Sequence, residues 1–330
     1  MRYSRTQRGQ QFRQPCAARL KLPRMPVCEV DPWRFQFFEQ VPCPDHVRIP
    51  TEDADAWAWN PAHRHVYDKL QVALSQGLLA APHGVMPPHW PVFSKPIVNL
   101  KGMGRDSRLL RDSHAYAASE TPGHMWVEVL EGDHVSTDVA VVDGQPHWWC
   151  HATGAPIGDG MFDYWTIHAG ALPALEAHAG EWIASQLSGY TGMVNLETIG
   201  GQIIEAHLRF ADQWPDLYGG SDWVRALVGL YSGEGWRLQH EHRRDGYSLA
   251  LFVPHPPITP RHPPAELVRG VRALAGVTSV QITFHQDRPP ESHAMPPGGF
   301  RVAIINTFDL AAGQAARRRL AEWFNAAIHY

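Results

Sequence analysis

The chain has 330 residues, of which 44% are hydrophobic and 19% are charged. This length fits about two globular domains or one large one, and the composition is sufficient for a sizeable core. The 29 Lys and Arg side chains oppose 33 Asp and Glu side chains, a formal net charge of −4. Overall charge therefore gives no reason to expect a nucleic-acid or anionic-membrane partner.

The sequence shows neither a membrane-spanning pattern nor a disulfide pattern. No apolar run reaches the roughly 18 residues that a spanning helix needs, and four cysteines are too few and too widely spaced for a disulfide framework or a zinc cluster. We expect a cytoplasmic protein. Residues 1–24 carry seven basic side chains and no acid, which is typical of a transit peptide, an anion-binding arm or a poorly ordered terminus.

The first predicted elements lie between residues 60 and 142. The spacing of apolar residues predicts a helix over 60–76 that begins at Asn60-Pro61 and ends at Gly77. A short strand is expected over 90–98, followed by a glycine-containing loop over 99–104. Two β-rich runs, 125–130 and 136–142, are separated by Glu131-Gly132-Asp133, which indicates a hairpin.

The rest of the chain alternates between helical and strand patterns. We expect a helix over 172–187 and a second hairpin with arms 193–199 and 202–210 around Gly200-Gly201. The C-terminal elements predict a small α+β module: strands over 247–253, 278–284 and 300–306, and helices over 264–274 and 309–328, the last capped by Asp309.

The second hairpin carries an unusual set of polar residues. Because side chains alternate between the faces of a strand, Glu205, His207 and Arg209 share one face. A two-residue turn at Gly200-Gly201 pairs Glu197 with Ile204 and separates the two glutamates. A three-residue loop that includes Gln202 instead pairs Glu197 with Glu205 and Asn195 with His207, and leaves Leu196, Ile204, Ala206 and Leu208 on an apolar face.

The second register predicts a divalent-cation site. Two facing carboxylates repel each other by about 0.2–1 kcal/mol on a sheet, and a cation such as Mg²⁺ reverses the sign of that interaction. Glu197, Glu205 and His207 are the candidate metal ligands. The alternative is a solvated polar face with incidental charges.

Five segments in order resemble the motifs of the ATP-grasp superfamily. Ile204–Arg209 resembles its E-x-N-x-R strand. The earlier segments are Tyr67-Asp68-Lys69-Leu70 followed by Gly84-Val85-Met86-Pro87, Phe93-Ser94-Lys95-Pro96, the loop through Gly102 and Gly104, and Trp126–Gly132, which resembles the hinge strand. Each motif alone is weak, but the order and approximate spacing over 67–209 are more specific.

The resemblance implies an α+β ATP-grasp fold, in which two α+β subdomains clamp the nucleotide. It divides the chain into a lead-in segment (1–90), a central subdomain (91–153), a subdomain with the metal-binding hairpin (154–234) and an accessory α+β module (235–330). The implied cofactors are ATP and Mg²⁺ or Mn²⁺. The implied nucleotide-binding residues are Lys69, Lys95, Lys101, Gly102, Gly104, Glu128, Val129, Leu130, Asp133 and His134.

The resemblance also implies a reaction. Phosphoryl transfer from ATP activates a carboxylate as an acyl phosphate, which an amine attacks to give an amide and ADP. Arg209, Lys95 and His207 are the candidate catalytic residues, with Arg209 holding the acyl phosphate or the substrate carboxylate. The expected partners are a small carboxylate and an amine of amino-acid or peptide type, and a homo-oligomer is possible.

The sequence departs from the family pattern at two places. His207 stands where the family has Asn, and Asp133 or His134 replaces the acid that contacts the ribose. These departures leave two alternatives to a ligase: an ATP-binding or regulatory protein without turnover, and a phosphotransferase on the same fold.

Overall fold

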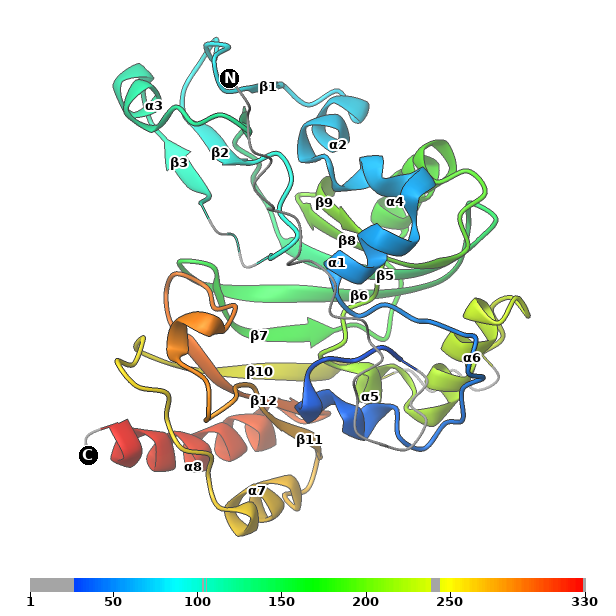
Figure 1. Ribbon diagram of the computed structural model, residues 1–330, viewed down its shortest axis with the longest axis vertical. Helices are drawn as coiled ribbons and strands as arrows, with labels where there is room; N and C mark the ends of the chain where they lie inside the picture. Colours follow the sequence, from blue (N-terminus) through cyan, green and yellow to red (C-terminus); the bar gives the residue numbers. More distant parts are fainter. Residues whose placement is uncertain (1–26, 103, 105, 239–243, 329–330) are drawn as a thin grey trace, which may run out of the picture.

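The computed structural model describes residues 27–102, 104, 106–238 and 244–328, so the basic segment 1–24 lies outside the described part. Two antiparallel sheets, one of four strands and one of eight, form its framework (Figure 1). Helices flank both sheets. The architecture confirms the predicted α+β class.

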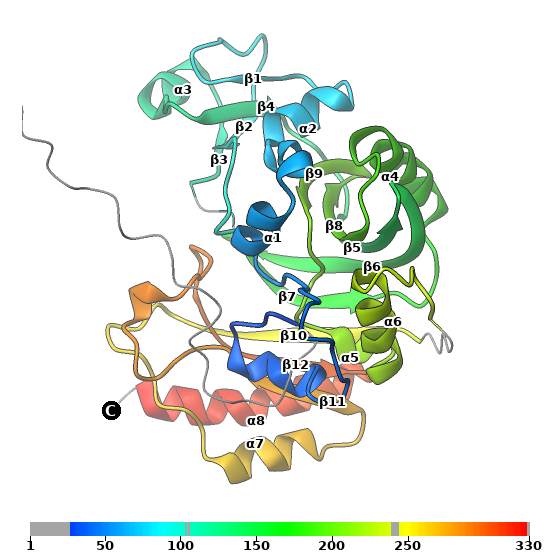
Figure 2. The ribbon, with the colours of Figure 1, turned by 45° about the vertical axis from the view of Figure 1, so that its right-hand side comes forward.

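The small sheet has the strand order β1-β4-β2-β3 and forms the lobe at the top of Figures 1 and 2. Its strands are β1 (Ala80–Pro82), β2 (Val92–Pro96), β3 (Arg108–Leu110) and β4 (His124–Glu128). Helices α2 (Lys69–Ser75) and α3 (Ser113–Ser119) belong to this lobe. Met125 and Trp126 on β4 are buried, one in each of the two small apolar clusters beside this sheet.

The large sheet has the order β11-β12-β10-β7-β6-β5-β8-β9, and every neighbouring pair is antiparallel. Its strands are β5 (His134–Val142), β6 (Gln145–Gly158), β7 (Met161–Ile167), β8 (Gly192–Ile199), β9 (Gln202–His207), β10 (Gly246–Val253), β11 (Val277–Ile282) and β12 (Phe300–Thr307). Strands β6 and β7 lie outside the predicted elements, because their alternation of buried and exposed positions is irregular.

Helices cover both ends of the large sheet. They are α4 (Pro173–Gln186), α5 (Pro215–Tyr218), α6 (Ser221–Tyr231), α7 (Ala265–Arg272) and α8 (Leu310–Ile328), with short 3₁₀ turns η1 (Pro32–Phe37) and η3 (Pro290–Ser292). The Asp309 carboxylate accepts a hydrogen bond from the Ala312 amide and caps α8 as predicted. Within the described residues, no helix has the length and apolar character needed to cross a bilayer.

The prediction of one helix over 60–76 is wrong. The chain forms a helix α1 (Asp53–Trp59), a 3₁₀ helix η2 (Pro61–Tyr67) and then α2. The break lies at Asp68, where the backbone is extended. The Asp68 side chain caps α2 by accepting a hydrogen bond from the Gln71 amide. An N-cap begins a new helix because its carboxylate satisfies an amide at the helix start.

The first predicted hairpin is also wrong. Strand β4 belongs to the small sheet and β5 to the large one, so Glu131-Gly132-Asp133 connects two sheets instead of closing a hairpin. This connection lies on the Gly200-Gly201 turn: a Cβ at Gly132 would lie 2.7 Å from Gly200 Cα, and the Gly200 amide donates to the Asp133 carbonyl. Only glycines permit so close an approach of two backbones.

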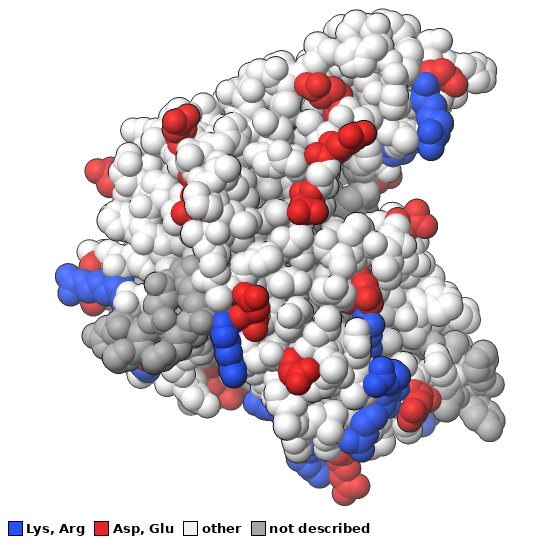
Figure 3. All heavy atoms as spheres, turned by 180° about the vertical axis from the view of Figure 1, so that it is seen from behind, with Lys and Arg blue, Asp and Glu red and all other residues white. Residues whose placement is uncertain are grey.

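The large sheet runs through two of the predicted segment boundaries. Residue 153 lies within β6, and β10 of the C-terminal module pairs directly with β7. The sheet is thus continuous across these boundaries, and the division into segments 1–90, 91–153, 154–234 and 235–330 stays a prediction. From behind, the small lobe overhangs the larger body with a notch between them, and basic and acidic side chains lie in small separate groups (Figure 3).

Candidate functional site

The hairpin of β8 and β9 has the register that brings the glutamates together. Glu197 lies opposite Glu205 and Asn195 opposite His207. The loop, however, is the two-residue turn Gly200-Gly201, and the extra residue is a bulge on β9. The prediction of a three-residue loop is therefore wrong, although its pairing is confirmed, because a bulge shifts the register by one residue.

The bulge falls at Ile204. Its neighbour Ile203 takes the core position and is fully buried, while Ile204 is only half-buried, so the predicted place of Ile204 on the apolar face is wrong. Leu196, Ala206 and Leu208 are buried as predicted, in the cluster that packs the hairpin against α4. Because this apolar face packs against α4, the polar face of the hairpin is directed toward the small lobe.

Two lysines of the small lobe reach the hairpin. Lys95 on β2 donates from Nζ to the carbonyl oxygen of the bulged Ile204 at 2.9 Å, and Lys69 Nζ lies 2.8 Å from Glu205 Oε1. Both lysines are buried. Burial, and then the charge of Lys69, lower the pKa of Lys95 to about 8, while the two glutamates oppose that shift.

Helix α2 is held at both ends, which fixes Lys69. The Lys69 amide donates to the Ile97 carbonyl beyond β2. At the other end Gln76 binds Ile203 on the outer strand β9: its Nε2 donates to the Ile203 carbonyl, and its Oε1 accepts from the Ile203 amide, both at 2.8 Å. An amide side chain thus covers part of an open sheet edge, which otherwise presents unpaired backbone groups.

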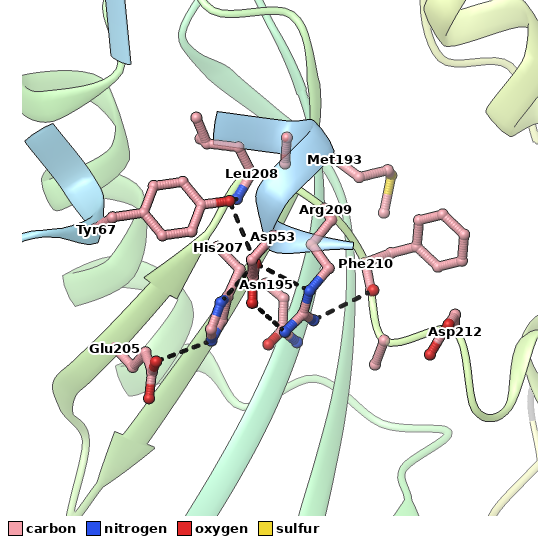
Figure 4. Close-up of polar contacts among 12 residues, drawn as sticks. Asp53, Tyr67, Met193, Asn195, Glu205, His207, Leu208, Arg209, Phe210 and Asp212 are labelled. Atoms are coloured by element: carbon pink, nitrogen blue, oxygen red, sulfur yellow. Dashed lines mark hydrogen bonds and ion pairs between the residues drawn. The ribbon is translucent and has the colours of Figure 1, made fainter. Parts of the chain in front are cut away.

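Asp53 on α1 is the centre of a buried network that the sequence analysis missed (Figure 4). Arg209 Nε and Nη2 donate to its two carboxylate oxygens, each at 3.1 Å, and His207 Nδ1 lies 2.9 Å from Oδ1. The Tyr67 hydroxyl donates to Asp53 and accepts from the Leu208 amide. Burial alone raises the pKa of Asp53, but Arg209 and His207 outweigh it and hold that pKa well below its usual range.

Glu197 faces the connection between the sheets. Its Oε2 lies 3.1 Å from His134 Nε2, and the His134 ring packs edge-on against Phe162 and Trp165. Burial raises the pKa of Glu197, whereas the hydrogen bond with His134 and the nearby charges lower it, and the net shift is downward. The predicted residues Glu197 and His134 are thus brought together.

A second polar row crosses three strands on the same face of the sheet as the two glutamates. Asp138 on β5, Asn195 on β8 and His207 on β9 are consecutive partners, and Asn195 Nδ2 donates to Asp138 Oδ1 at 2.8 Å. The Tyr218 hydroxyl also donates to Asp138, at 2.6 Å. Burial raises the pKa of Asp138 to about 6 despite these donors. Asp138 is another residue that the sequence analysis missed.

The other predicted nucleotide-binding residues lie in the hinge and the loop. The Glu128 carboxylate accepts from the Leu79 amide at 2.7 Å, so its side chain supports β1, and Val129, Leu130 and Asp133 follow β4 in the connection between the sheets. In the loop, the Asn99 side chain binds both the Lys101 amide and the Gly102 carbonyl. Lys101 is exposed, and Gly102 and Gly104 have positive φ.

A group of acids lies near the Asp53 network. Glu29, Asp31 and Glu52 each offer a carboxylate oxygen, and these oxygens lie within 4.8 Å of one another. Arg34 contacts both Asp31 and Asp212 beside them. Burial, followed by Asp212 and Asp31, raises the pKa of Glu52 to about 7. No pattern marked this group, because Glu29 and Asp31 precede η1 whereas Glu52 precedes α1.

No family model and no curated protein sequence matches. Solved structures do match: an L-amino acid ligase from Bacillus licheniformis (TM-score 0.55, 12% identity, 78% of this chain and 71% of that one) and a carboxyaminoimidazole ribonucleotide synthase from Aspergillus clavatus complexed with ATP (0.56, 9%, 81% and 75%). The chain has the ATP-grasp fold.

A third ATP-grasp structure agrees: an N5-carboxyaminoimidazole ribonucleotide synthetase from Thermus thermophilus has a TM-score of 0.52 and 16% identity, over 83% of this chain and 75% of that one. Identities this low establish the fold alone. The predicted ATP-grasp resemblance and fold class are confirmed. The roles of individual site residues stay predictions.

Proposed function

We propose that the protein is an ATP-dependent ligase that activates a small carboxylate as an acyl phosphate for attack by an amine, and releases ADP. One observation carries this proposal: two buried lysines of the small lobe, Lys69 on α2 and Lys95 on β2, reach a hairpin of the large sheet. On that hairpin Glu197 and Glu205 face each other. A phosphate chain with its bound cation requires cationic groups and carboxylates close together, which supports the proposal.

The donor set suits a divalent cation. Glu197 and Glu205 supply carboxylate oxygens, and His207 supplies a ring nitrogen 3.7 Å from Glu205 Oε1. Mg²⁺ or Mn²⁺ would neutralise phosphate oxygens there. The two glutamates pair with Lys69 and with His134, and a bound cation would take the place of these partners.

Lys95 and Lys69 would bind phosphate oxygens of ATP, with Lys101, Gly102 and Gly104 covering the terminal phosphates. The hinge residues Glu128, Val129, Leu130, Asp133 and His134 would lie along the base and sugar. An arginine has five N–H donors; Arg209 uses one on each nitrogen for Asp53 and the Phe210 carbonyl. Its remaining donors would hold the acyl phosphate or the carboxylate.

ADP release tests the proposal. Purified protein with Mg²⁺ or Mn²⁺ is expected to release ADP only when a suitable acid and amine from an amino-acid panel are both present. Glu205→Gln is expected to lower that rate by at least about 100-fold, since it removes a metal-binding charge. Glu181→Gln, an exposed acid on α4, is the matched control. Unchanged turnover in Glu205→Gln contradicts the assignment of that glutamate.

A second candidate is an ATP-binding protein without ligase activity. The bidentate pairing of Arg209 with the protein's own Asp53 favours it, because a carboxylate already occupies the Nε–Nη2 edge of the guanidinium. This candidate predicts tight ATP binding with no ADP release across the panel. Phosphorylated product without amide would instead indicate a phosphotransferase.

A further inference from the structure

The buried ring of His207 lies between two carboxylates on opposite sides. Its Nδ1 is 2.9 Å from Asp53 Oδ1, and its Nε2 is 3.7 Å from Glu205 Oε1 (Figure 4). Asp53 reaches this position from α1, which lies 154 residues earlier in the chain. The first contact is a hydrogen bond and the second is too long to be one.

The contacts of Asp53 determine which ring nitrogen carries the proton. Arg209 and Tyr67 both donate to Asp53, and the bidentate pairing with Arg209 keeps the carboxylate ionised. An ionised carboxylate only accepts hydrogen bonds. The ring nitrogen that faces it, Nδ1, must therefore be the donor, which leaves Nε2 directed toward the glutamate pair.

We propose that Asp53 is a positioning residue that holds His207 with its proton on Nδ1, so that the Nε2 lone pair becomes the third ligand of the cation site on the hairpin. The inference rests on the proposed function in one respect, the binding of a divalent cation between Glu197 and Glu205. Carboxylates that accept from the second ring nitrogen orient metal-binding histidines and raise their basicity.

The position of Asp53 is itself fixed. Ala56 on the same helix is fully buried, and Asn60 ends the helix by donating from Nδ2 to the Ala56 carbonyl. Tyr67 links the Asp53 carboxylate to the backbone amide of Leu208, directly after β9. The carboxylate therefore cannot turn away from His207 without breaking bonds to Tyr67 and Arg209.

An imidazole in the donor set changes the choice of metal ion. Mg²⁺ strongly prefers oxygen ligands, whereas Mn²⁺ also accepts imidazole nitrogen. The site is therefore selective for Mn²⁺ over Mg²⁺ to a degree that depends on His207. Replacing His207 by Asn gives an all-oxygen donor set and is expected to reduce that selectivity.

Metal binding to the full chain without nucleotide tests the inference. Mn²⁺ is titrated by electron paramagnetic resonance, and Mg²⁺ affinity is obtained by competition. Asp53→Asn is expected to weaken Mn²⁺ binding roughly 10- to 100-fold. His207→Asn is expected to lower the ratio of Mn²⁺ to Mg²⁺ affinity while Mg²⁺ still binds. Asp55→Asn, which removes the same charge from the same turn of α1, is the control.

Nitrogen NMR of ¹⁵N-histidine-labelled protein gives the second readout. The His207 signals, identified by their loss in His207→Asn, are expected to show a proton on Nδ1 in the unaltered chain. An Nδ1 without a proton, or an unchanged Mn²⁺ to Mg²⁺ ratio in His207→Asn, overturns the inference. Both measurements decide the question even if Asp53→Asn does not fold.

These results are distinguishable from a failure of the proposed function. If the protein binds Mn²⁺ selectively through His207 but releases no ADP, the role of Asp53 is supported and the ligase proposal is contradicted. If the protein releases ADP but His207→Asn leaves the ratio of Mn²⁺ to Mg²⁺ affinity unchanged, the role of Asp53 is contradicted and the ligase proposal stands.

Discussion

The charged side chains around the hairpin are paired, and each is buried or half-buried. Lys69 pairs with Glu205, His134 with Glu197, and Arg209 with Asp53, while Lys95 donates to a backbone carbonyl. Removing one partner of a buried pair is costly because it leaves the other charge uncompensated. Binding of the proposed cation and phosphate groups would therefore require an exchange of partners. Substitutions at this site are best made between residues of similar shape.

Lys95 gives a pH dependence that can be measured. Burial first, and then Lys69, lower the pKa of its ammonium group to about 8. The group is charged below that pH and loses its proton as the pH rises through it, so we expect ATP affinity to fall between about pH 7 and pH 9. Calorimetric titrations of ATP across this range measure the effect.

Lys95→Arg is the control, because a guanidinium stays protonated over the whole range. It is expected to bind ATP with a flatter pH profile. A decrease of equal steepness in Lys95→Arg would show that another group causes the titration.

At the scale of elements, the β8–β9 hairpin depends on one short turn. Gly200 and Gly201 both have positive φ, but a Cβ at Gly200 would lie 2.2 Å from the Glu131 carbonyl oxygen, whereas a Cβ at Gly201 meets nothing within 4 Å. Only the first glycine is therefore required by a close contact as well as by backbone conformation.

We predict that Gly200→Ala destabilises the protein more than Gly201→Ala. Both substitutions incur about 1–2 kcal/mol for a left-handed L-residue, and the contact at Gly200 adds about 1–3 kcal/mol of overpacking. Urea unfolding of the two variants measures the difference. Equal losses in free energy of unfolding would show that the connection between the sheets moves aside at no cost.

The elements also show how far the sequence could predict the site. The alternation of polar and apolar residues in the hairpin was sufficient to pair Glu197 with Glu205. It could not distinguish a longer loop from a bulge at Ile204, because Ile203 and Ile204 are both suited to the core. Asp53 could not be predicted, because it lies 154 residues before His207 in the chain and neither local spacing nor periodicity carries information about so distant a contact.

At the scale of the whole molecule, the large sheet joins segments that the sequence separates. Strand patterns predicted β10, β11 and β12, but they indicate which residues are buried and not which strand is the neighbour. The pairing of β10 with β7 makes the C-terminal part an extension of the sheet that carries the hairpin. We therefore expect the large sheet to unfold as one cooperative unit.

Leu320→Ala tests this cooperativity. Leu320 is fully buried in the cluster of α8, β10 and β12, so the substitution is expected to cost about 2–5 kcal/mol. Scanning calorimetry and hydrogen exchange in β8 and β9 are expected to show the same loss of stability. Leu74→Ala, exposed on α2, is the control. A loss confined to β10, β11 and β12 would show two independent units.

The hydrogen bond from Lys95 to the Ile204 carbonyl has a kinetic consequence. This hydrogen bond connects the two lobes, because Lys95 belongs to the small sheet and the bulged Ile204 belongs to the large sheet. The two sheets share no strand. Under the proposed function, a phosphate group that takes the place of the carbonyl as acceptor arrives only after this hydrogen bond breaks. The rate of nucleotide entry, and not only the affinity, would then depend on an irregularity in a sheet.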